Sequence, residues 1–188
     1  MKKKHFNRAI RSMLFADSLL LVATAMLGPL YAIFVEELGG DLLDAGATFA
    51  VFSFVAGVVI LISGAMGDRA KEPELIIVAG YLITAIGFFA YAFVNSMVAL
   101  MAVQVIVGVG LAVRAPVFDA LFSEHLDKHR EGIEWGAWDS MSYFAGAFGA
   151  VVGGYIASNF GFTYIFFIMA VLSLISAVYI YSLPRKVL

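Results

Sequence analysis

Six long apolar stretches, separated by short polar segments, make up most of the sequence. A helix needs about 20 predominantly apolar residues to cross the hydrocarbon core of a bilayer, and each stretch reaches that length. The stretches are expected to be helices, because a strand in an open sheet would leave backbone groups unpaired in lipid. The pattern predicts an all-α membrane protein with one transmembrane domain over residues 1–188 and spans at about 12–35, 45–67, 75–94, 97–122, 137–159 and 164–183.

The composition indicates that lipid is the solvent of this chain. Hydrophobic residues make up 62% of the sequence and charged residues 14%, whereas soluble domains carry about 45–50% apolar and about 25% charged residues. The absence of cysteine excludes disulfides, thiolate metal sites and cysteine nucleophiles. His125 and His129 have a helical metal-binding spacing, but no third ligand is evident, so we expect neither a metal nor a cofactor.

The basic residues are segregated to one side of the predicted bundle. Segments 36–44, 95–96 and 159–163 contain no Lys or Arg, and eleven of the twelve basic residues lie at the other ends of the spans. The positive-inside rule makes that side cytoplasmic, which predicts a multi-pass protein of the cell (inner) membrane with both termini in the cytoplasm. Residues 23–25 resemble a signal-peptide cleavage site, but the apolar run continues to Val35, so we expect the first span to be retained.

One acidic residue interrupts the first span. Asp17 lies within the apolar run, and an intramembrane carboxylate is costly enough to suggest a function. Thr24 and Tyr31 follow at intervals of seven residues, which places all three side chains on one face of a helix. Asp17 is a candidate for binding substrate or carrying a coupling proton. Pairing with a structural cation is the alternative, and its shallow position near the basic side favours that alternative.

Span four carries a second set of polar candidates. Gln104 lies near mid-membrane, where it can contact a solute or hydrogen-bond a neighbouring helix. Arg114 and Asp119 point about 140° apart around the helix, so Arg114 is expected to reach a carboxylate on another helix or an anionic solute. An interfacial network on the cytoplasmic side is the alternative for these charges. The carboxylates that Arg114 could reach are Asp17, Asp139 and Asp119 of a second copy.

Two further groups of side chains lie near span ends. Asp139 and Tyr143 are one turn apart near the start of span five and are expected to face the same cavity. Aromatic residues, including Phe88 and Tyr91, gather near the outer end of span three. They are predicted to be lipid-facing or interfacial anchors.

Small residues recur every four positions along span five. One stripe contains Gly149 and Gly153, and another contains Gly146, Ala150 and Gly154. Small residues at this spacing let another helix backbone approach closely, which favours helix association in lipid. The stripes predict either packing within the six-helix bundle or packing against a second bundle.

Several short motifs, in order along the chain, resemble those of the major facilitator superfamily. Residues 64–71 read GAMGDRAK, similar to the family's GxxxDRxGRR loop between spans two and three. Residues 104–110 read QVIVGVG, which follows the spacing of RxxQGxG in span four. Residues 145–154 read AGAFGAVVGG, similar to GxxxGPxxGG in span five, and 161–166 read GFTYIF, similar to GWRWIF. The resemblance covers nearly the whole chain.

The resemblance implies a specific architecture and interface. Family members normally have twelve spans in two six-span halves, and this chain resembles the N-terminal half, with its 3+3 inverted repeat. It implies that Gly64, Asp68 and Arg69 belong to a gating loop, in which the Asp68 carboxylate meets the N-terminus of span five in the other half. The alternative is that Asp68 is a solvated loop residue that pairs with Arg69 or Lys71. The chain departs from the family pattern at Gln104, where the family has Arg, and at Ala150, where it has Pro.

The implied function is secondary active transport of a small solute by alternating access, with protons as a candidate coupling ion. The expected partners are the lipid bilayer, the solute and a second parallel copy that docks through spans two and five; nucleic acid is not expected. The alternatives are a half-transporter that needs a different six-helix partner and a non-transporting membrane scaffold or sensor. No intramembrane enzyme motif or phosphate-binding loop is present in the sequence, so we do not expect an enzyme.

Overall fold

The computed structural model describes residues 6–184 and 187–188. Within that part of the chain there are no strands, and six helical segments are long and apolar enough to cross a membrane. This confirms the predicted all-α membrane fold. The elements are α1 (Arg8–Leu27), the 3₁₀ turn η1 (Gly28–Leu30), α2 (Tyr31–Glu37), α3 (Leu42–Gly67), α4 (Pro73–Tyr91), α5 (Met97–Glu124), α6 (Glu131–Phe160) and α7 (Phe162–Ser182).

Two elements differ from the pattern of apolar residues. The first span is divided by η1, which contains Pro29, because proline has no backbone N–H to continue the helix. The fifth span begins at Glu131 instead of 137. Its polar first turns remain helical because the buried Glu134 side chain accepts a hydrogen bond from the Asp127 backbone N–H at 2.9 Å.

Local capping explains where several helices begin. The side chain of Asn7 accepts a hydrogen bond from the Ile10 N–H at the start of α1. Asp41 and Asp44 form a reciprocal capping box at the start of α3. Ser96 accepts from the Ala99 N–H at the start of α5. Each cap satisfies a backbone donor that has no partner within its own helix.

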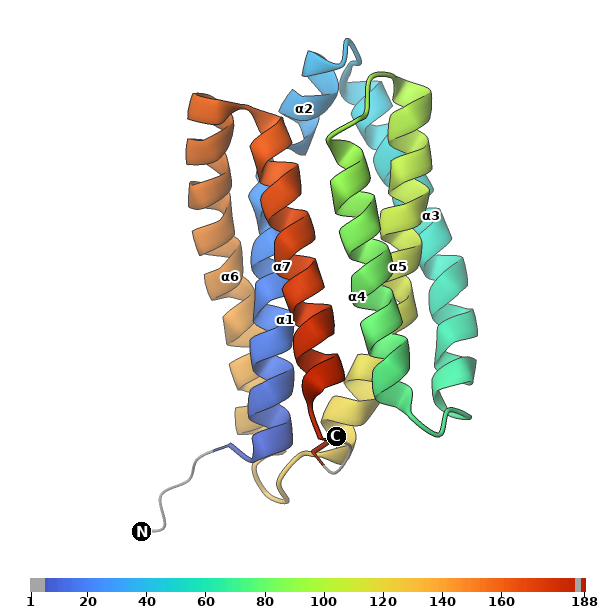
Figure 1. Cartoon of the computed structure of the whole chain (residues 1–188), viewed down its shortest axis with the longest axis vertical. Coiled ribbons are helices and arrows are strands. Elements are labelled where there is room, and N and C mark those ends of the chain that lie inside the picture. The colour runs from blue at the N-terminus through green and yellow to red at the C-terminus, as the bar shows by residue number, and fades with distance from the viewer. Residues whose placement is uncertain (1–5, 185–186) are drawn as a thin grey trace.

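The helices form two groups of three, shown side by side in Figure 1. One group contains α1, α6 and α7, and the other contains α3, α4 and α5. The groups meet mainly where α4 packs against α7. α1 begins and α7 ends at the same end of the bundle, and α2 lies at the opposite end (Figure 1). We call the first the basic end, because the described basic residues Arg8, Arg11, Arg69, Lys71, Lys128 and Arg130 lie there or in its connections.

Two glycines of the family-like motif let α5 lie close to both of its neighbours. A Cβ placed on Gly110 would lie 2.6 Å from the Thr84 backbone nitrogen of α4. A Cβ placed on Gly108 would lie 3.0 Å from the Phe52 carbonyl oxygen of α3. Residues two apart on a helix point about 200° from each other. The GxG spacing therefore serves two helix contacts on opposite sides of α5.

Helices α3 and α6 leave most of their surface uncovered. Of the 26 described residues of α3, two are buried, and of the 30 described residues of α6, four are buried. Large apolar side chains lie on these open faces, including Phe54 at 75% and Phe144 at 75% exposure. A surface of this kind is compatible with lipid or with a second membrane-embedded bundle.

The glycines of α6 divide between two environments. Gly149 and Gly153 are buried against α1, where a Cβ on Gly149 would lie 2.7 Å from the Val22 carbonyl oxygen. No described atom lies within 4 Å of a Cβ added at Gly146 or Gly154. Ala150, which lies between these two glycines in the sequence, is partly buried. The first stripe therefore packs within the bundle, and the second remains open.

Candidate functional site

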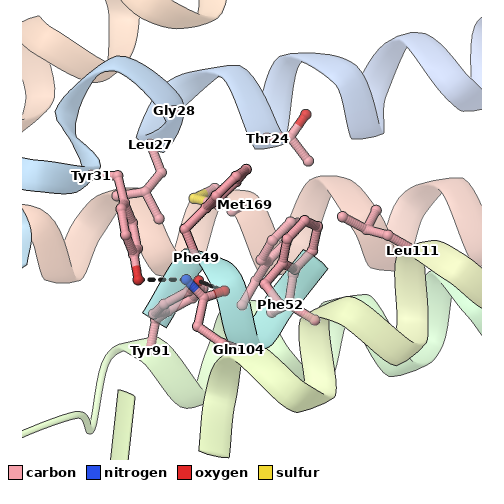
Figure 2. A pocket seen from close by; sticks show the side chains of 12 residues that line it. Thr24, Leu27, Gly28, Tyr31, Phe49, Phe52, Tyr91, Gln104, Leu111 and Met169 are labelled. Carbon is pink, nitrogen blue, oxygen red and sulfur yellow. Dashed lines mark hydrogen bonds between the residues drawn. The ribbon is translucent and has the colours of Figure 1, made fainter. Parts of the chain in front are cut away.

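A pocket of about 270 Å³ lies between the two three-helix groups. Figure 2 shows the side chains of Tyr31 and Tyr91 meeting the amide of Gln104. Gln104 lies seven residues from the α5 terminus opposite the basic end, or about 10 Å along the helix. Leu111, at the other end of the pocket, lies about 21 Å along it, so the pocket extends across the region expected at mid-membrane. The lining residues are Thr24, Leu27, Gly28, Tyr31, Phe49, Phe52, Phe88, Tyr91, Gln104, Val107, Leu111 and Met169.

A directed chain of hydrogen bonds crosses the polar side of this pocket. The Tyr91 hydroxyl donates to Gln104 Oε1 at 3.1 Å, and Gln104 Nε2 donates to the Tyr31 hydroxyl (Figure 2). The Tyr31 hydroxyl in turn donates to Thr48 Oγ1 at 2.6 Å. Thr48 donates to the backbone carbonyl of Asp44 at 2.8 Å. The chain joins α4, α5, α2 and α3 and places one amide and two phenols at the pocket.

The remaining wall of the pocket is apolar. Phe49 and Phe52 come from α3, with ring centroids 5.7 Å apart. Phe88 and Met169 close the side formed by α4 and α7. Thr24 lines the pocket, but its hydroxyl already donates to the backbone of its own helix at Leu20 or Leu21. The pocket therefore suits a largely apolar solute that can hydrogen-bond at one side.

A buried ion pair lies closer to the basic end. Arg114 Nη1 lies 2.7 Å from Asp17 Oδ1, and the Asp17 side chain is 0% exposed. The Tyr81 hydroxyl donates to Asp17 Oδ1 at 3.3 Å, and Trp138 Nε1 donates to Oδ2 at 3.0 Å. Asp17 thus receives donors from α4, α5 and α6. Of the carboxylates that the sequence offered to Arg114 within one chain, Asp17 is the one it contacts.

The surroundings of Arg114 combine aromatic rings with incomplete hydrogen bonding. Its guanidinium carbon lies 5.3 Å from the ring centroid of Tyr81 and 5.4 Å from that of Phe118. Such contacts stabilise a desolvated cation. Among the described residues, Arg114 Nε has no hydrogen-bond partner. Within the described part of the chain, its Nε–H therefore stays unpaired beside the carboxylate.

The structure buries Asp17 inside the bundle, while its shallow depth in the membrane stays a prediction. The helix begins at Arg8, nine residues earlier, which places Asp17 about 13 Å along α1. Its carboxylate is fully buried among helices. Asp17 and the pocket are separate features, because Asp17 does not line the pocket that Thr24 and Tyr31 share.

The other predicted polar candidates lie on open surfaces. Asp119 on α5 and Asp139 on α6 are exposed, and neither forms an ion pair within the described residues. Tyr143, one turn from Asp139, is 81% exposed. None of the three lines the pocket around Gln104. They lie where only lipid, water or a second bundle can reach them.

The predicted gating loop borders a second cavity at the basic end. This cavity, of about 620 Å³, is lined by Gly64 and Asp68 together with Pro116 and Glu124 of α5. Asp68 is exposed at the end of α3, and Arg69 is exposed beside it. In the described part of the chain Asp68 forms no ion pair with Arg69 or with any other basic residue.

Several residues of these sites were absent from the predicted set. Tyr91 and Phe88 were interpreted as lipid-facing anchors, which was wrong, since they are 4% and 2% exposed. Thr48 follows Asp44 by one helical turn, and this spacing was only a weak indication of the hydrogen bond between them. Tyr81 and Trp138, which hold Asp17, gave no signal distinct from ordinary apolar positions.

Comparison with known proteins is consistent with this geometry. A family model described as the Major Facilitator Superfamily matches residues 13–187. The chain is 26% identical over 171 residues to the multidrug resistance protein MdtG of Enterobacter lignolyticus, covering 88% of this chain and 41% of that protein. It is 24% identical over 183 residues to MdtG of Salmonella typhimurium, covering 95% and 45% of the two chains.

The relatives differ from this chain in length. The alignment to MdtG of Yersinia enterocolitica, at 24% identity over 178 residues, covers 93% of this chain and 43% of that protein. The chain thus spans less than half the length of the curated relatives that it matches. The family match nevertheless extends over most of the chain and agrees with its six membrane-spanning helical segments. This chain belongs to the Major Facilitator Superfamily.

Proposed function

We propose that this chain is one half of a secondary active transporter that moves a small solute by alternating access. The observation that carries the proposal is the pocket around Gln104, which lies between two helix groups at the depth where transporters of this kind bind their solutes. We also propose that the basic end faces the cytoplasm of a cell with an inner membrane, following the positive-inside rule.

The lining of the pocket supports a class of solute. Aromatic and aliphatic side chains form most of the wall, and the Tyr31–Gln104–Tyr91 group supplies the polar contacts. We propose a small, mainly apolar solute with one hydrogen-bonding group. The relatives named multidrug resistance proteins are consistent with such a solute.

Substitutions in the hydrogen-bonded group test this assignment. A solute found by a thermal-shift screen of the chain in lipid nanodiscs should bind Gln104→Leu or Tyr31→Phe about two- to tenfold more weakly, because a pocket hydrogen bond contributes about 0.5–1.5 kcal/mol. Tyr155→Phe, on the exposed face of α6, is the matched control and should leave the affinity unchanged. Equal binding to wild type and to Gln104→Leu would place the solute elsewhere.

We propose protons as the coupling ion and Asp17 as their site. Asp17 is a buried carboxylate whose charge is balanced by Arg114 across the boundary between the two helix groups. Adding a proton would remove that balance and weaken the attraction between α1 and α5. The electrostatic change would thus act at the boundary between the two helix groups, beside the solute pocket.

A second six-helix unit is needed to complete the pathway, and we propose a parallel second copy of this chain. The open faces of α3 and α6 support this arrangement, since each could cover the other across a two-fold axis. The exposed Asp68 carboxylate would then lie near the N-terminus of the partner's α6, where a negative charge is favoured.

Cysteine crosslinking can test the parallel dimer in membranes, because the native sequence contains no cysteine. Val58 lies nine residues from the basic end of α3, and Ser140 lies nine residues from the basic end of α6. Both therefore sit at a depth of about 13 Å. In the variant Val58→Cys/Ser140→Cys we expect intermolecular crosslinks between the two positions, read by gel mobility and peptide mass spectrometry.

A depth-mismatched pair provides the control. Tyr155 lies about 36 Å from the basic end of α6, so Val58→Cys/Tyr155→Cys should not crosslink in a parallel dimer. Crosslinking of this control in place of the first pair would indicate an antiparallel arrangement and contradict the proposal. The absence of both crosslinks would instead favour a different six-helix partner, a candidate that the greater length of the relatives supports.

A further inference from the structure

We propose that a groove between α1 and α7 at the basic end binds the phosphate headgroup of an anionic phospholipid. The groove has a volume of about 560 Å³ and is lined by Arg8, Arg11, Ser12, Phe15 and Tyr179. It lies apart from the solute pocket and from the gating loop, with which it shares no lining residue. The proposal is therefore independent of the transported solute and of the second six-helix unit.

The groove concentrates positive charge without a protein partner. Arg8 and Arg11 are three residues apart and lie on one face of α1. Both side chains are exposed, and within the described residues neither takes part in an ion pair. Two guanidinium groups at this spacing can bind the oxygens of one phosphate from both sides, since guanidinium matches phosphate geometry.

Two hydroxyl groups extend the polar part of the groove. The Tyr179 hydroxyl of α7 donates to Ser12 Oγ of α1 at 3.4 Å, which is longer than a typical O–H···O hydrogen bond. A headgroup oxygen can therefore compete for these hydroxyls at little cost. The groove thus offers hydrogen-bond donors from both α1 and α7. An arginine-rich face of one helix alone would offer donors from that helix only.

The apolar part of the groove favours a lipid over a free anion. Phe15 lies seven residues after Arg8, or about 10 Å further along α1, and is 49% exposed. Its ring packs edge-on against Tyr179, with centroids 4.9 Å apart. The order along α1 is therefore cations at the membrane boundary followed by an aromatic surface at acyl-chain depth. This is the order of headgroup and chain in a phospholipid.

Native mass spectrometry of the full chain can measure the binding. We expect phosphatidylglycerol to bind more tightly than phosphatidylcholine. In the variant Arg8→Gln/Arg11→Gln the phosphatidylglycerol affinity should fall by about thirtyfold, or about fivefold for each arginine. The matched control Lys71→Gln/Lys128→Gln removes two exposed positive charges at the same end and should keep the affinity within about twofold. Equal losses in the two variants would indicate diffuse surface attraction and overturn the site.

A second arm separates a lipid from a free phosphate. Glycerophosphoglycerol, the deacylated form of phosphatidylglycerol, carries the same phosphodiester charge without acyl chains, so it should fail to displace phosphatidylglycerol at concentrations well above that of the lipid. Displacement by glycerophosphoglycerol, or equally tight binding of it, would make the groove a site for soluble anions and overturn the lipid assignment.

A measurement on the unmodified chain keeps the proposal testable if the arginine variants fold poorly. Phosphatidylglycerol with a photoreactive acyl chain should label peptides that contain Phe15 or Tyr179 after irradiation in nanodiscs. Labelling spread evenly over the exposed faces of α3 and α6 would show that the groove holds no particular lipid.

Discussion

Asp17→Ala is expected to lose most of the folded protein in detergent, with a destabilisation of about 3–5 kcal/mol. The variant leaves the Arg114 guanidinium buried without the carboxylate that lies 2.7 Å away in the native protein. Tyr81 and Trp138 would also lose their acceptor. Thermal unfolding of purified protein, followed by circular dichroism or size-exclusion recovery, would measure the loss.

The double variant Asp17→Leu/Arg114→Met is the decisive control. It removes both charges and restores apolar contacts, so it should recover much of the stability that either single substitution removes. In the same variant, solute addition should no longer drive proton movement in proteoliposomes that contain the complete transporter. If Asp17→Ala is as stable as wild type, the ion pair does not hold the helix groups together. Persistent proton coupling in the double variant would refute Asp17 as the proton site.

Gly153→Ala is expected to lower stability and Gly154→Ala to leave it unchanged or raise it, although the two residues are neighbours on α6. A Cβ on Gly153 would meet backbone atoms of Met26, including its carbonyl carbon at 2.8 Å, so α1 and α6 would have to separate. Overpacking of this kind costs about 1–3 kcal/mol. At Gly154 no described atom lies within 4 Å of the added carbon, and alanine favours the helix by up to about 1 kcal/mol.

The two alanine variants also separate the two glycine stripes. Unfolding of each variant in nanodiscs, compared with wild type, should show a lower midpoint for Gly153→Ala and an unchanged or higher midpoint for Gly154→Ala. Equal destabilisation by both would mean that the Gly154 side is covered in the membrane. A neutral Gly153→Ala would contradict the close approach of α1 and α6.

The number and order of the spans could be predicted because a membrane imposes a simple requirement. Each crossing must be about 20 apolar residues long and must pair its backbone internally. The ends were harder to place where polar residues continue a helix beyond the apolar core, as at Glu131. There the helix is extended by specific contacts, such as that of Glu134 with the Asp127 backbone.

The pocket was predicted only in part. Tyr31 and Gln104 are polar residues within apolar spans, so they were recognisable. Tyr91 was assigned to the surface because a helix that is apolar on all sides does not reveal which face points inward. That rotation depends on the packing of α4 against α5 and α7, which glycines such as Gly80 permit by close approach to Arg114.

The partner of Arg114 illustrates the same limit. The angle between Arg114 and Asp119 correctly separated these side chains on one helix. The choice among carboxylates on other helices depended on where α1 crosses α5, and the sequence does not encode that crossing in any local pattern. The donors from Tyr81 and Trp138 then complete the site from two further helices.

The break at η1 divides the first span into two helices, α1 and α2, that contact different sets of helices. On one side of η1, α1 packs with α6 and α7. On the other side, α2 packs with α3, and Tyr31 is bonded to Gln104 and Thr48, while Phe34 of α2 packs against Phe162 and Phe166 of α7. A change of backbone angle at the 3₁₀ turn, residues 28–30, would therefore move Tyr31 relative to α1. The short helix α2 therefore connects the 3₁₀ turn to the pocket, which Tyr31 lines. Loss of the Tyr31 hydroxyl bonds would remove the polar contacts of α2 with α3 and α5 and leave the packing of Phe34 against α7 in place.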